Sequence, residues 1–146
     1  MIEYSETQLA YLAGLIDADG SIDLRLKKAG NLLLRAQVYN TDRQLMDWLS
    51  LTFGGHVHRV GRRDVAHWKP EYTWYLNGQG AVEMLSLVAP YMHVKRSRAE
   101  LAIEAWARRD PTPIADRRKP MREGLVEMRQ GYVDQMRELN KKGRAS

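Results

Sequence analysis

The first pattern along the chain is a hydrophobic repeat at helical spacing over residues 5–19. Ser5 is followed three positions later by Gln8, which is the spacing of a capping box at the start of a helix. Gly20 follows the repeat and acts as a helix stop signal. One face of this predicted helix is hydrophobic and consists of Leu9, Leu12 and Ile16.

Hydrophobic and polar residues then alternate over residues 21–28 and again over residues 32–40. Alternation with a period of two residues predicts strands that have one buried and one exposed face. Residues 29–31 lie between them and include a glycine, so we expect a turn and an antiparallel hairpin. The side chains expected to be buried are Ile22, Leu24, Leu26, Leu32, Leu34, Ala36 and Val38.

The remaining chain continues with helical and strand-like segments. A helix over residues 42–53 begins after Thr41 or at Asp42 and ends at a Gly-Gly pair. Its expected buried face consists of Leu45, Trp48, Leu49 and Thr52. We further expect a weaker hairpin from residues 56–62 and 71–77, and helices over 81–89, 96–109 and 120–140. Aromatic side chains expected in the core are Trp48, Trp74 and Trp106.

This order of elements predicts an α+β fold. Two hairpins, each with one polar and basic face, can form a single antiparallel sheet that is covered by helices on its other face. Residues 1–109 contain the predicted core of the domain. Residues 110–146 are expected to be a helical extension of the same domain that ends in a frayed basic tail over residues 141–146.

Composition narrows the functional classes. The chain has 146 residues and no cysteine, which excludes a disulfide framework, a thiol nucleophile and a cysteine-based zinc site. No segment approaches the roughly 20 apolar residues of a membrane span, and the start of the chain lacks a targeting signature. We therefore expect a cytoplasmic protein in a reducing compartment, with no membrane partner.

The positive charge is unevenly distributed. The formal net charge is +5 and the sequence pI is about 9.6. Residues 1–107 are balanced in charge, and residues 108–146 carry the whole excess. Within the balanced part, basic residues outnumber acidic ones over residues 25–79. Two basic regions of this kind are consistent with a polyanionic partner.

The first predicted helix carries the residues with chemical potential. Ala10, Ala13 and Gly14 are small, and small residues let two helix backbones approach closely. Asp17 and Asp19 lie at the end of the same helix, where the negative end of the helix dipole disfavours a carboxylate. A divalent cation would offset this cost, and oxygen ligands suit Mg²⁺. Packing two such helices together would bring the two sets of carboxylates together.

Residues 12–20 read Leu-Ala-Gly-Leu-Ile-Asp-Ala-Asp-Gly, letter for letter the motif that names the LAGLIDADG homing endonucleases. The resemblance covers about residues 5–107 and includes the order of elements, Asn40-Thr41-Asp42, Gly54-Gly55, and the segment from Pro90-Tyr91 to Lys95-Arg96. It implies the αββαββα fold of that family, with a saddle-shaped antiparallel sheet backed by helices.

The family resemblance also implies a function. Proteins of this family with one motif act as homodimers, so we expect a homodimer that makes metal-dependent double-strand cuts in a long pseudo-palindromic DNA target, as in intron homing. Mg²⁺ is the expected cofactor, and Mn²⁺ or Ca²⁺ could occupy the same site. The dimer interface would include Ala10, Ala13, Gly14 and Asp17.

The same resemblance assigns site residues. Asp19 and the backbone carbonyl of Ala18 match the metal ligands of the family. Lys95 matches a lysine near the scissile phosphate, and Asn40 matches a residue that positions water or metal. Asp17 matches a position without a usual catalytic role, so we expect its carboxylate to pair locally.

A twisted antiparallel ribbon can enter the major groove of DNA and contact base edges. Arginine and lysine suit guanine, glutamine suits adenine, and an aspartate can accept from cytosine. The side chains expected on the DNA-facing surface are Asp23, Arg25, Lys27, Arg35, Gln37, Tyr39, His58, Arg62, Thr73 and Tyr75.

Two other functions use the same fold. An RNA maturase would bind intron RNA and assist splicing, and a DNA-binding regulator would keep the fold without the chemistry. The presence of Asp19, Asn40 and Lys95 together favours the endonuclease, because a binding module needs none of them.

Overall fold

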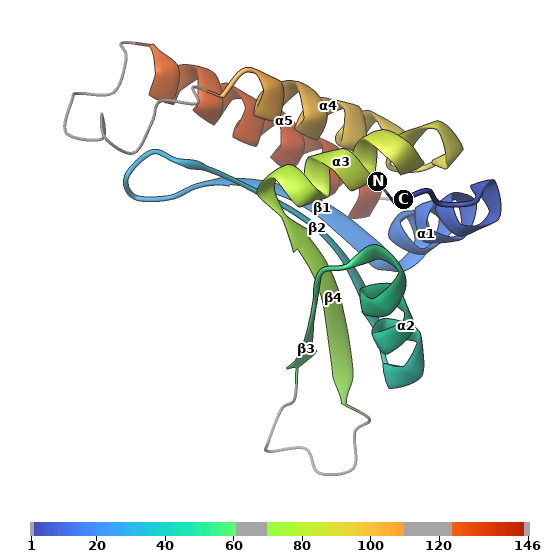
Figure 1. The fold of residues 1–146 in the computed structure, drawn as a ribbon. Helices are drawn as coiled ribbons and strands as arrows, with labels where there is room; N and C mark the ends of the chain where they lie inside the picture. The colour runs from blue at the N-terminus through green and yellow to red at the C-terminus, as the bar shows by residue number, and fades with distance from the viewer. Residues whose placement is uncertain (1, 61–69, 110–123, 145–146) are drawn as a thin grey trace.

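The first helix and its cap agree with the sequence pattern. The computed structural model describes residues 2–60, 70–109 and 124–144 (Figure 1). Helix α1 spans Glu6–Asp19 and starts at the capping box, with the Ser5 hydroxyl accepting from the Gln8 backbone N–H at 3.1 Å. The Gln8 side chain accepts in return from the Ser5 N–H at 3.0 Å. Two N–H groups at the helix start are thereby paired.

A single antiparallel sheet forms the centre of the fold. Its strands are β1 (Gly20–Leu26), β2 (Leu32–Asn40), β3 (His56–Val60) and β4 (Glu71–Asn77). They lie in the order β1-β2-β4-β3, so the two hairpins are joined through pairing of β2 with β4. The α+β class and the single sheet predicted from the sequence are confirmed.

The helices cover one face of this sheet. After α1 come α2 (Arg43–Phe53), α3 (Gly78–Val88), the 3₁₀ turn η1 (Ala89–Tyr91), α4 (Arg96–Ala107) and α5 (Leu125–Arg144). Figure 1 shows the β1–β2 and β3–β4 hairpins bending away from each other, with the helices on the convex side. We call the other, concave side of the sheet the open face.

The core lies between the sheet and the helices. Ile22, Leu34, Val38 and Trp74 are fully buried on the covered face of the sheet. The Trp74 indole N–H donates to the Gly54 carbonyl at 2.7 Å, so the tryptophan is buried without losing a hydrogen bond. Helices contribute further fully buried side chains, including Leu12, Ile16, Met46, Leu49, Leu85, Val88, Val133 and Met136.

Helix α5 covers the β1 edge of the sheet. The Arg129 guanidinium donates to the Gly30 carbonyl at 2.6 Å, and the Asn140 side-chain amide donates to the Ile22 carbonyl at 3.3 Å. Tyr132 and Met136 bury their side chains in the core between these two contacts. An uncovered edge strand is a template for pairing with another chain, and α5 removes that risk on this side.

Three local predictions are wrong. Helix α2 buries Met46, Leu49 and Phe53, so the predicted stripe was displaced by one residue for most of its members. Trp48 consequently lies on the surface, with 38% of its area exposed. The predicted frayed tail is helical through residue 144, because α5 continues beyond the expected end. Lys141 at this end is favourably placed for the helix dipole.

Candidate active site and nucleic-acid interface

The end of α1 passes directly into β1 without a loop. A Cβ atom at Gly20 would lie 2.5 Å from the Gln37 carbonyl oxygen and 2.7 Å from the Ile16 Cα, so only glycine fits this crossing. Ala18 and Asp19, the predicted metal ligands, are the last two residues of α1 and are both exposed. The crossing therefore presents the Asp19 carboxylate to solvent at the border between α1 and the sheet.

Asp17 turns back onto its own chain. Its carboxylate accepts the backbone N–H groups of His93 at 2.8 Å and of Lys95 at 2.9 Å. Burial raises the pKa of Asp17, but these N–H groups, that of Val94 and the Lys95 charge together hold the pKa below its ordinary value of 3.8. The local pairing predicted for Asp17 is thus observed, and it ties α1 to the segment before α4.

Lys95 completes this connection. Its ammonium group donates to the backbone carbonyls of Ile16 and Asp17, both at 2.9 Å. Partial burial and the positive charge of Arg98 lower the pKa of Lys95, whereas Asp17 and Asp19 raise it, and the net result lies below the ordinary value of 10.5. The ammonium therefore sits at the negative end of the α1 dipole and within electrostatic reach of Asp19.

Asn40 lies at the same end of the sheet. Strands β1 and β2 are antiparallel, and Gly20 at the start of β1 pairs with Val38. Asn40 therefore extends two residues beyond that pair, at the end of the sheet where α1 ends. The Asn40 side-chain oxygen accepts the Asp42 N–H at 2.9 Å, and Asp42 in turn caps α2. The fold thus brings Asp19, Lys95 and Asn40 to one end of α1 and β2.

The donor set at this end fits a hard cation. Asp19 provides a carboxylate and Ala18 a backbone carbonyl, which are oxygen ligands of the type Mg²⁺ prefers. Among the described residues, no group of three or more histidine, aspartate or glutamate side chains could hold a metal ion. Mg²⁺ usually binds through one or two carboxylates, with water and substrate phosphates completing its shell, so one carboxylate per chain suits it.

The open face carries an arginine held in a fixed orientation. The Arg35 Nε donates to the Asn77 side-chain oxygen at 2.9 Å, and its guanidinium carbon lies 4.2 Å from the centre of the Tyr75 ring. The His56 ring packs against the same Tyr75 ring, and the two ring centroids are 5.3 Å apart. This arrangement leaves the two terminal Arg35 nitrogens for a ligand, in the geometry that pairs with guanine or phosphate.

A second group on the open face contains Ser21, Asp23 and Gln37, which we call the acceptor cluster. The Gln37 side-chain nitrogen donates to the Ser21 hydroxyl at 2.8 Å and to an Asp23 carboxylate oxygen at 2.9 Å. The Ser21 hydroxyl donates to the same Asp23 oxygen at 3.4 Å. Only 7% of Gln37 is exposed, whereas Ser21 and Asp23 are half-buried, so the cluster reaches the surface mainly through these two residues.

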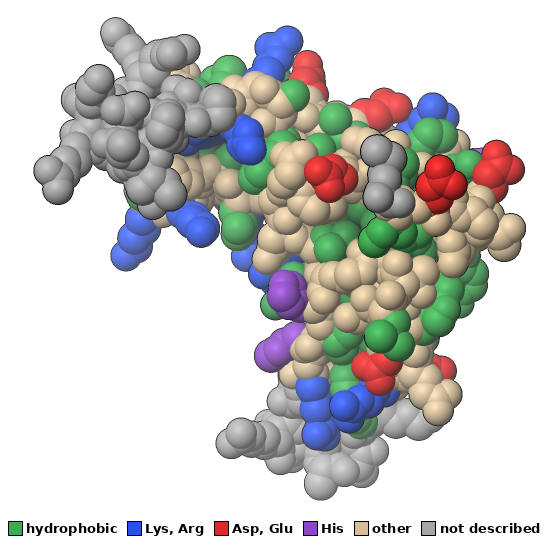
Figure 2. Space-filling view, viewed as in Figure 1, with side chains coloured by type: hydrophobic (Ala, Val, Ile, Leu, Met, Phe, Trp, Pro, Cys, Tyr) green, Lys and Arg blue, Asp and Glu red, His purple; other side chains and the backbone are tan. Residues whose placement is uncertain are grey.

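The other residues predicted to face DNA differ in exposure. Arg25, Lys27 and Tyr39 are exposed, whereas Thr73 is 94% covered because it lies between Tyr39 and His58, its partners on the neighbouring strands. Arg62 lies outside the described residues. Figure 2 shows basic and histidine side chains along the hollow side of the molecule, and most acidic side chains in that view over the helices.

The exposed side of α1 differs from the predicted small-residue face. Ala10 and Gly14 are exposed, but Ala13 is fully buried and faces the core of its own chain. The prediction for Ala13 as an interface residue is therefore wrong, because the core-facing stripe of α1 also needs a small residue where the helix packs closely. The stripe left open to solvent on α1 consists of Thr7, Ala10, Tyr11, Gly14 and Ala18.

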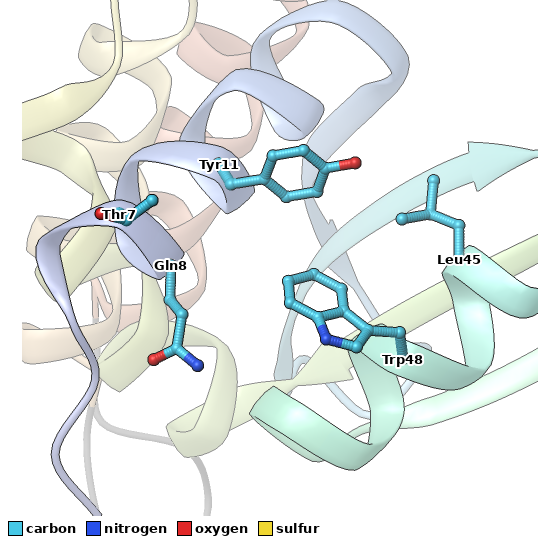
Figure 3. A pocket seen from close by; sticks show the side chains of 5 residues that line it. All are labelled: Thr7, Gln8, Tyr11, Leu45 and Trp48. Atoms are coloured by element: carbon cyan, nitrogen blue, oxygen red, sulfur yellow. The ribbon is translucent and has the colours of Figure 1, made fainter.

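The sequence did not reveal that Tyr11 of this stripe and two apolar residues of α2 are exposed. Tyr11 and Trp48 meet edge to face with ring centroids 5.5 Å apart and line a hollow of about 310 Å³ between α1 and α2 (Figure 3). Leu51 on α2 is 88% exposed. The spacing of Tyr11 with Ala10 and Gly14 could have revealed this surface, but the register of α2 could not be read from its pattern alone.

Solved structures share this fold. One is the homing endonuclease I-CvuI in complex with its target in the presence of Ca, at 19% identity and a TM-score of 0.69, covering 91% of this chain and 82% of that chain. The archaeal intron-encoded homing endonuclease I-Vdi141I complexed with DNA matches at 14% identity and a TM-score of 0.59, over 90% of this chain and 97% of that chain.

A third is the LAGLIDADG meganuclease I-AabMI bound to uncleaved DNA, at 18% identity and a TM-score of 0.51, over 68% of this chain and 35% of that chain. No family model and no curated protein sequence matches the chain. The chain therefore has the fold of the LAGLIDADG homing endonucleases, as its motif predicts. Within the described ranges, no helix combines the length and apolar composition needed to cross a bilayer.

Replacing Asp17 tests the connection between α1 and residues 93–95. We expect Asp17→Asn to lower the free energy of unfolding at neutral pH by about 1–3 kcal/mol, because the charged acceptor of two backbone N–H groups is lost. The folded-state pKa of Asp17 is depressed, so its contribution is present above pH 3.8 and is lost as the pH falls through the folded-state pKa.

Denaturant unfolding of the metal-free protein between neutral and acidic pH measures this difference. The gap between wild type and variant should narrow at acidic pH. Asp134→Asn, at an exposed carboxylate on α5, is the control and should stay within about 0.5 kcal/mol of wild type. An Asp17→Asn variant as stable as wild type at neutral pH would contradict the assignment.

Proposed function

We propose that this protein is a site-specific DNA endonuclease that hydrolyses phosphodiester bonds with a divalent cation and acts as a homodimer. The observation that carries the proposal is the Lys95 ammonium bonded to the last carbonyls of α1, beside the exposed Asp19 and at the border of an uncovered, partly basic sheet face. A binding module needs the sheet face but not a lysine and an exposed carboxylate at the end of α1. The structural neighbours named above are complexes with DNA, which supports the same function.

Each candidate residue around the end of α1 has a role in the proposed reaction. Asp19 and the Ala18 carbonyl would hold the divalent cation. The Lys95 ammonium, anchored on the α1 carbonyls, stabilises negative charge that develops on the phosphate. Burial lowers the pKa of Lys95, which brings proton exchange closer to neutral pH. Asn40 orients water from the adjacent end of β2.

The divalent cation supplies Lewis-acid stabilisation to the phosphoryl group when it is bound. The residues of the chain account for the remaining requirements. The open face binds the major groove, and exposed Arg25 and Lys27 on and beside β1 contribute positive charge along the DNA. Arg35 is held for a bidentate contact to guanine.

A second copy of the chain would complete the enzyme. One motif helix supplies one Asp19, and a double-strand cut needs one active site for each strand. The exposed stripe with Ala10 and Gly14, flanked by Tyr11 and Trp48, is a surface on which a second α1 could pack closely. A two-fold axis through this stripe would place both Asp19 residues together and match a pseudo-palindromic target.

The RNA maturase is the second candidate, since its function would also use a basic surface. The residues at the end of α1 favour the endonuclease, because splicing assistance needs neither Asp19 nor Lys95. A regulator without cleavage is disfavoured for the same reason.

Replacing Asp19 separates cleavage from binding. A cognate duplex is first selected from a randomised double-stranded DNA library by binding in Ca²⁺, and its cleavage is then followed in Mg²⁺. We expect Asp19→Asn to reduce the cleavage rate by about 100-fold or more, because a metal ligand is lost. Binding to the same duplex should persist, since the sheet is unchanged.

The matched control is Asp134→Asn, which removes an exposed carboxylate on α5 and should cleave like wild type. Equal loss of cleavage and binding in Asp19→Asn would contradict the metal role. A wild-type protein that selects no cleavable duplex but binds intron RNA tightly would replace the endonuclease by the maturase.

Replacing Gly14 tests the dimer. No atom lies within 4 Å of a Cβ placed at Gly14, so Gly14→Leu fits the isolated chain, and leucine favours a helix over glycine by about 1 kcal/mol. We expect this variant to be monomeric by light scattering after size-exclusion chromatography, while wild type is dimeric, because the side chain separates the two α1 backbones.

Gly131→Leu on α5 is the matched control, since a Cβ there also has no neighbour within 4 Å. This variant should remain dimeric. A dimeric Gly14→Leu protein, or a wild-type protein that stays monomeric at all concentrations, would argue against the α1 interface.

A further inference from the structure

The acceptor cluster on the open face has used all of its hydrogen-bond donors internally. Its side chains contain three donating hydrogens, one on the Ser21 hydroxyl and two on the Gln37 amide. The two amide hydrogens go to Ser21 and Asp23, and the hydroxyl hydrogen goes to Asp23. What remains for a ligand is therefore a set of acceptors alone, formed by the Gln37 carbonyl oxygen and the free Asp23 oxygen.

The orientation of Gln37 follows from chemistry. A carboxylate accepts hydrogen bonds, so Gln37 directs its amide nitrogen, and not its oxygen, towards Asp23. The Gln37 carbonyl oxygen is then left without a partner in the described part of the chain. This oxygen is not among the fully buried side-chain atoms that lack a partner, so part of its surface stays open on this face of the sheet.

The neighbouring Arg35 does not donate a hydrogen bond to this cluster among the described residues. Arg35 is the cross-strand partner of Asp23, but its Nε donates to Asn77 and its guanidinium stacks on Tyr75, both on β4. No ion pair joins Arg35 to Asp23 among the described residues. The open face thus has an acceptor cluster at β1 and β2 and a separate donor at Arg35.

We propose that Ser21, Asp23 and Gln37 determine specificity for cytosine at one base pair of each half-site; this inference rests on the proposed DNA endonuclease function. In the major groove, guanine and thymine present acceptors at the corresponding position, so the cluster repels them. On its own edge, cytosine presents its amino group and no acceptor. Adenine also presents an amino group, but its N7 is an acceptor that faces the carboxylate and disfavours it.

The cluster also has a defined place along the DNA. Asp23 is the fourth residue of β1, which begins directly after Asp19, so the two residues are at most about 13 Å apart along the chain. DNA rises about 3.4 Å per base pair, so the selected cytosine lies within about four base pairs of the cut. A glutamine whose amide hydrogens were free would select adenine. Gln37 uses both amide hydrogens within the cluster, so we expect it to favour cytosine.

The experiment compares the base preferences of wild type and three variants on a randomised double-stranded DNA library, selected by binding in Ca²⁺ and sequenced. We expect wild type to enrich cytosine at one position of each half-site, by roughly tenfold or more over guanine and thymine. Asp23→Asn introduces a donor, so guanine or thymine should rise at that position and the preference should fall about tenfold.

Ser21→Ala should act differently. It releases one Gln37 N–H next to the Gln37 carbonyl oxygen, which allows the bidentate contact to adenine, so the preference should shift from cytosine to adenine. Ser21→Thr keeps the hydroxyl and is the matched control, and it should select cytosine as wild type does.

The possible outcomes separate the two proposals. In one outcome, wild type enriches a defined duplex, and Asp23→Asn and Ser21→Ala enrich the same bases as wild type. This result would overturn the specificity assignment and leave the endonuclease proposal intact. Enrichment of guanine or thymine throughout the positions next to the cut would also overturn it. Failure of wild type to enrich any duplex would overturn the DNA-binding function itself, and the assignment with it.

Discussion

The contact of the Lys95 ammonium with the last carbonyls of α1 is the interaction on which the site depends. A helix ends with unpaired carbonyls and a partial negative charge, which is an unfavourable place for Asp17 and Asp19. Lys95 satisfies two of these carbonyls, and backbone N–H groups of residues 93 and 95 hold the Asp17 carboxylate. Asp19 is then the carboxylate that remains exposed and able to bind a cation.

Two constraints fix the position of this exposed carboxylate. Gly20 permits α1 to cross β2 so closely that the helix continues into β1 without a loop. The β1–β2 register then places Asn40 at the same end of the sheet. Because the helices all cover the opposite side, the chemistry at α1 borders the open face, where Arg35 provides donors and the acceptor cluster provides acceptors. The proposed cleavage and base selection would in this way use one continuous surface.

Local signals predicted much of this structure. The alternation over residues 32–40 matches β2 to the residue, and the Ser5–Gln8 spacing matches the observed cap. The sequence pattern failed where tertiary packing decides which of two adjacent helix faces is buried. Ala13 is buried because α1 packs tightly on its own chain. Trp48 is exposed because Met46 faces the core instead. Side-chain networks were also beyond the pattern, since the bonds of Ser21 with Gln37 and of Asn77 with Arg35 join residues that are distant in sequence.

The most direct test of this account is an NMR titration of the Lys95 side-chain nitrogen in the metal-free protein, with and without Asp19→Asn. Burial and Arg98 lower the pKa of Lys95 while Asp17 and Asp19 raise it, so the account predicts a pKa below the ordinary value of 10.5 in wild type and a still lower one in the variant. A Lys95 that titrates at its ordinary value and does not respond to Asp19→Asn would show that the two groups do not share a site.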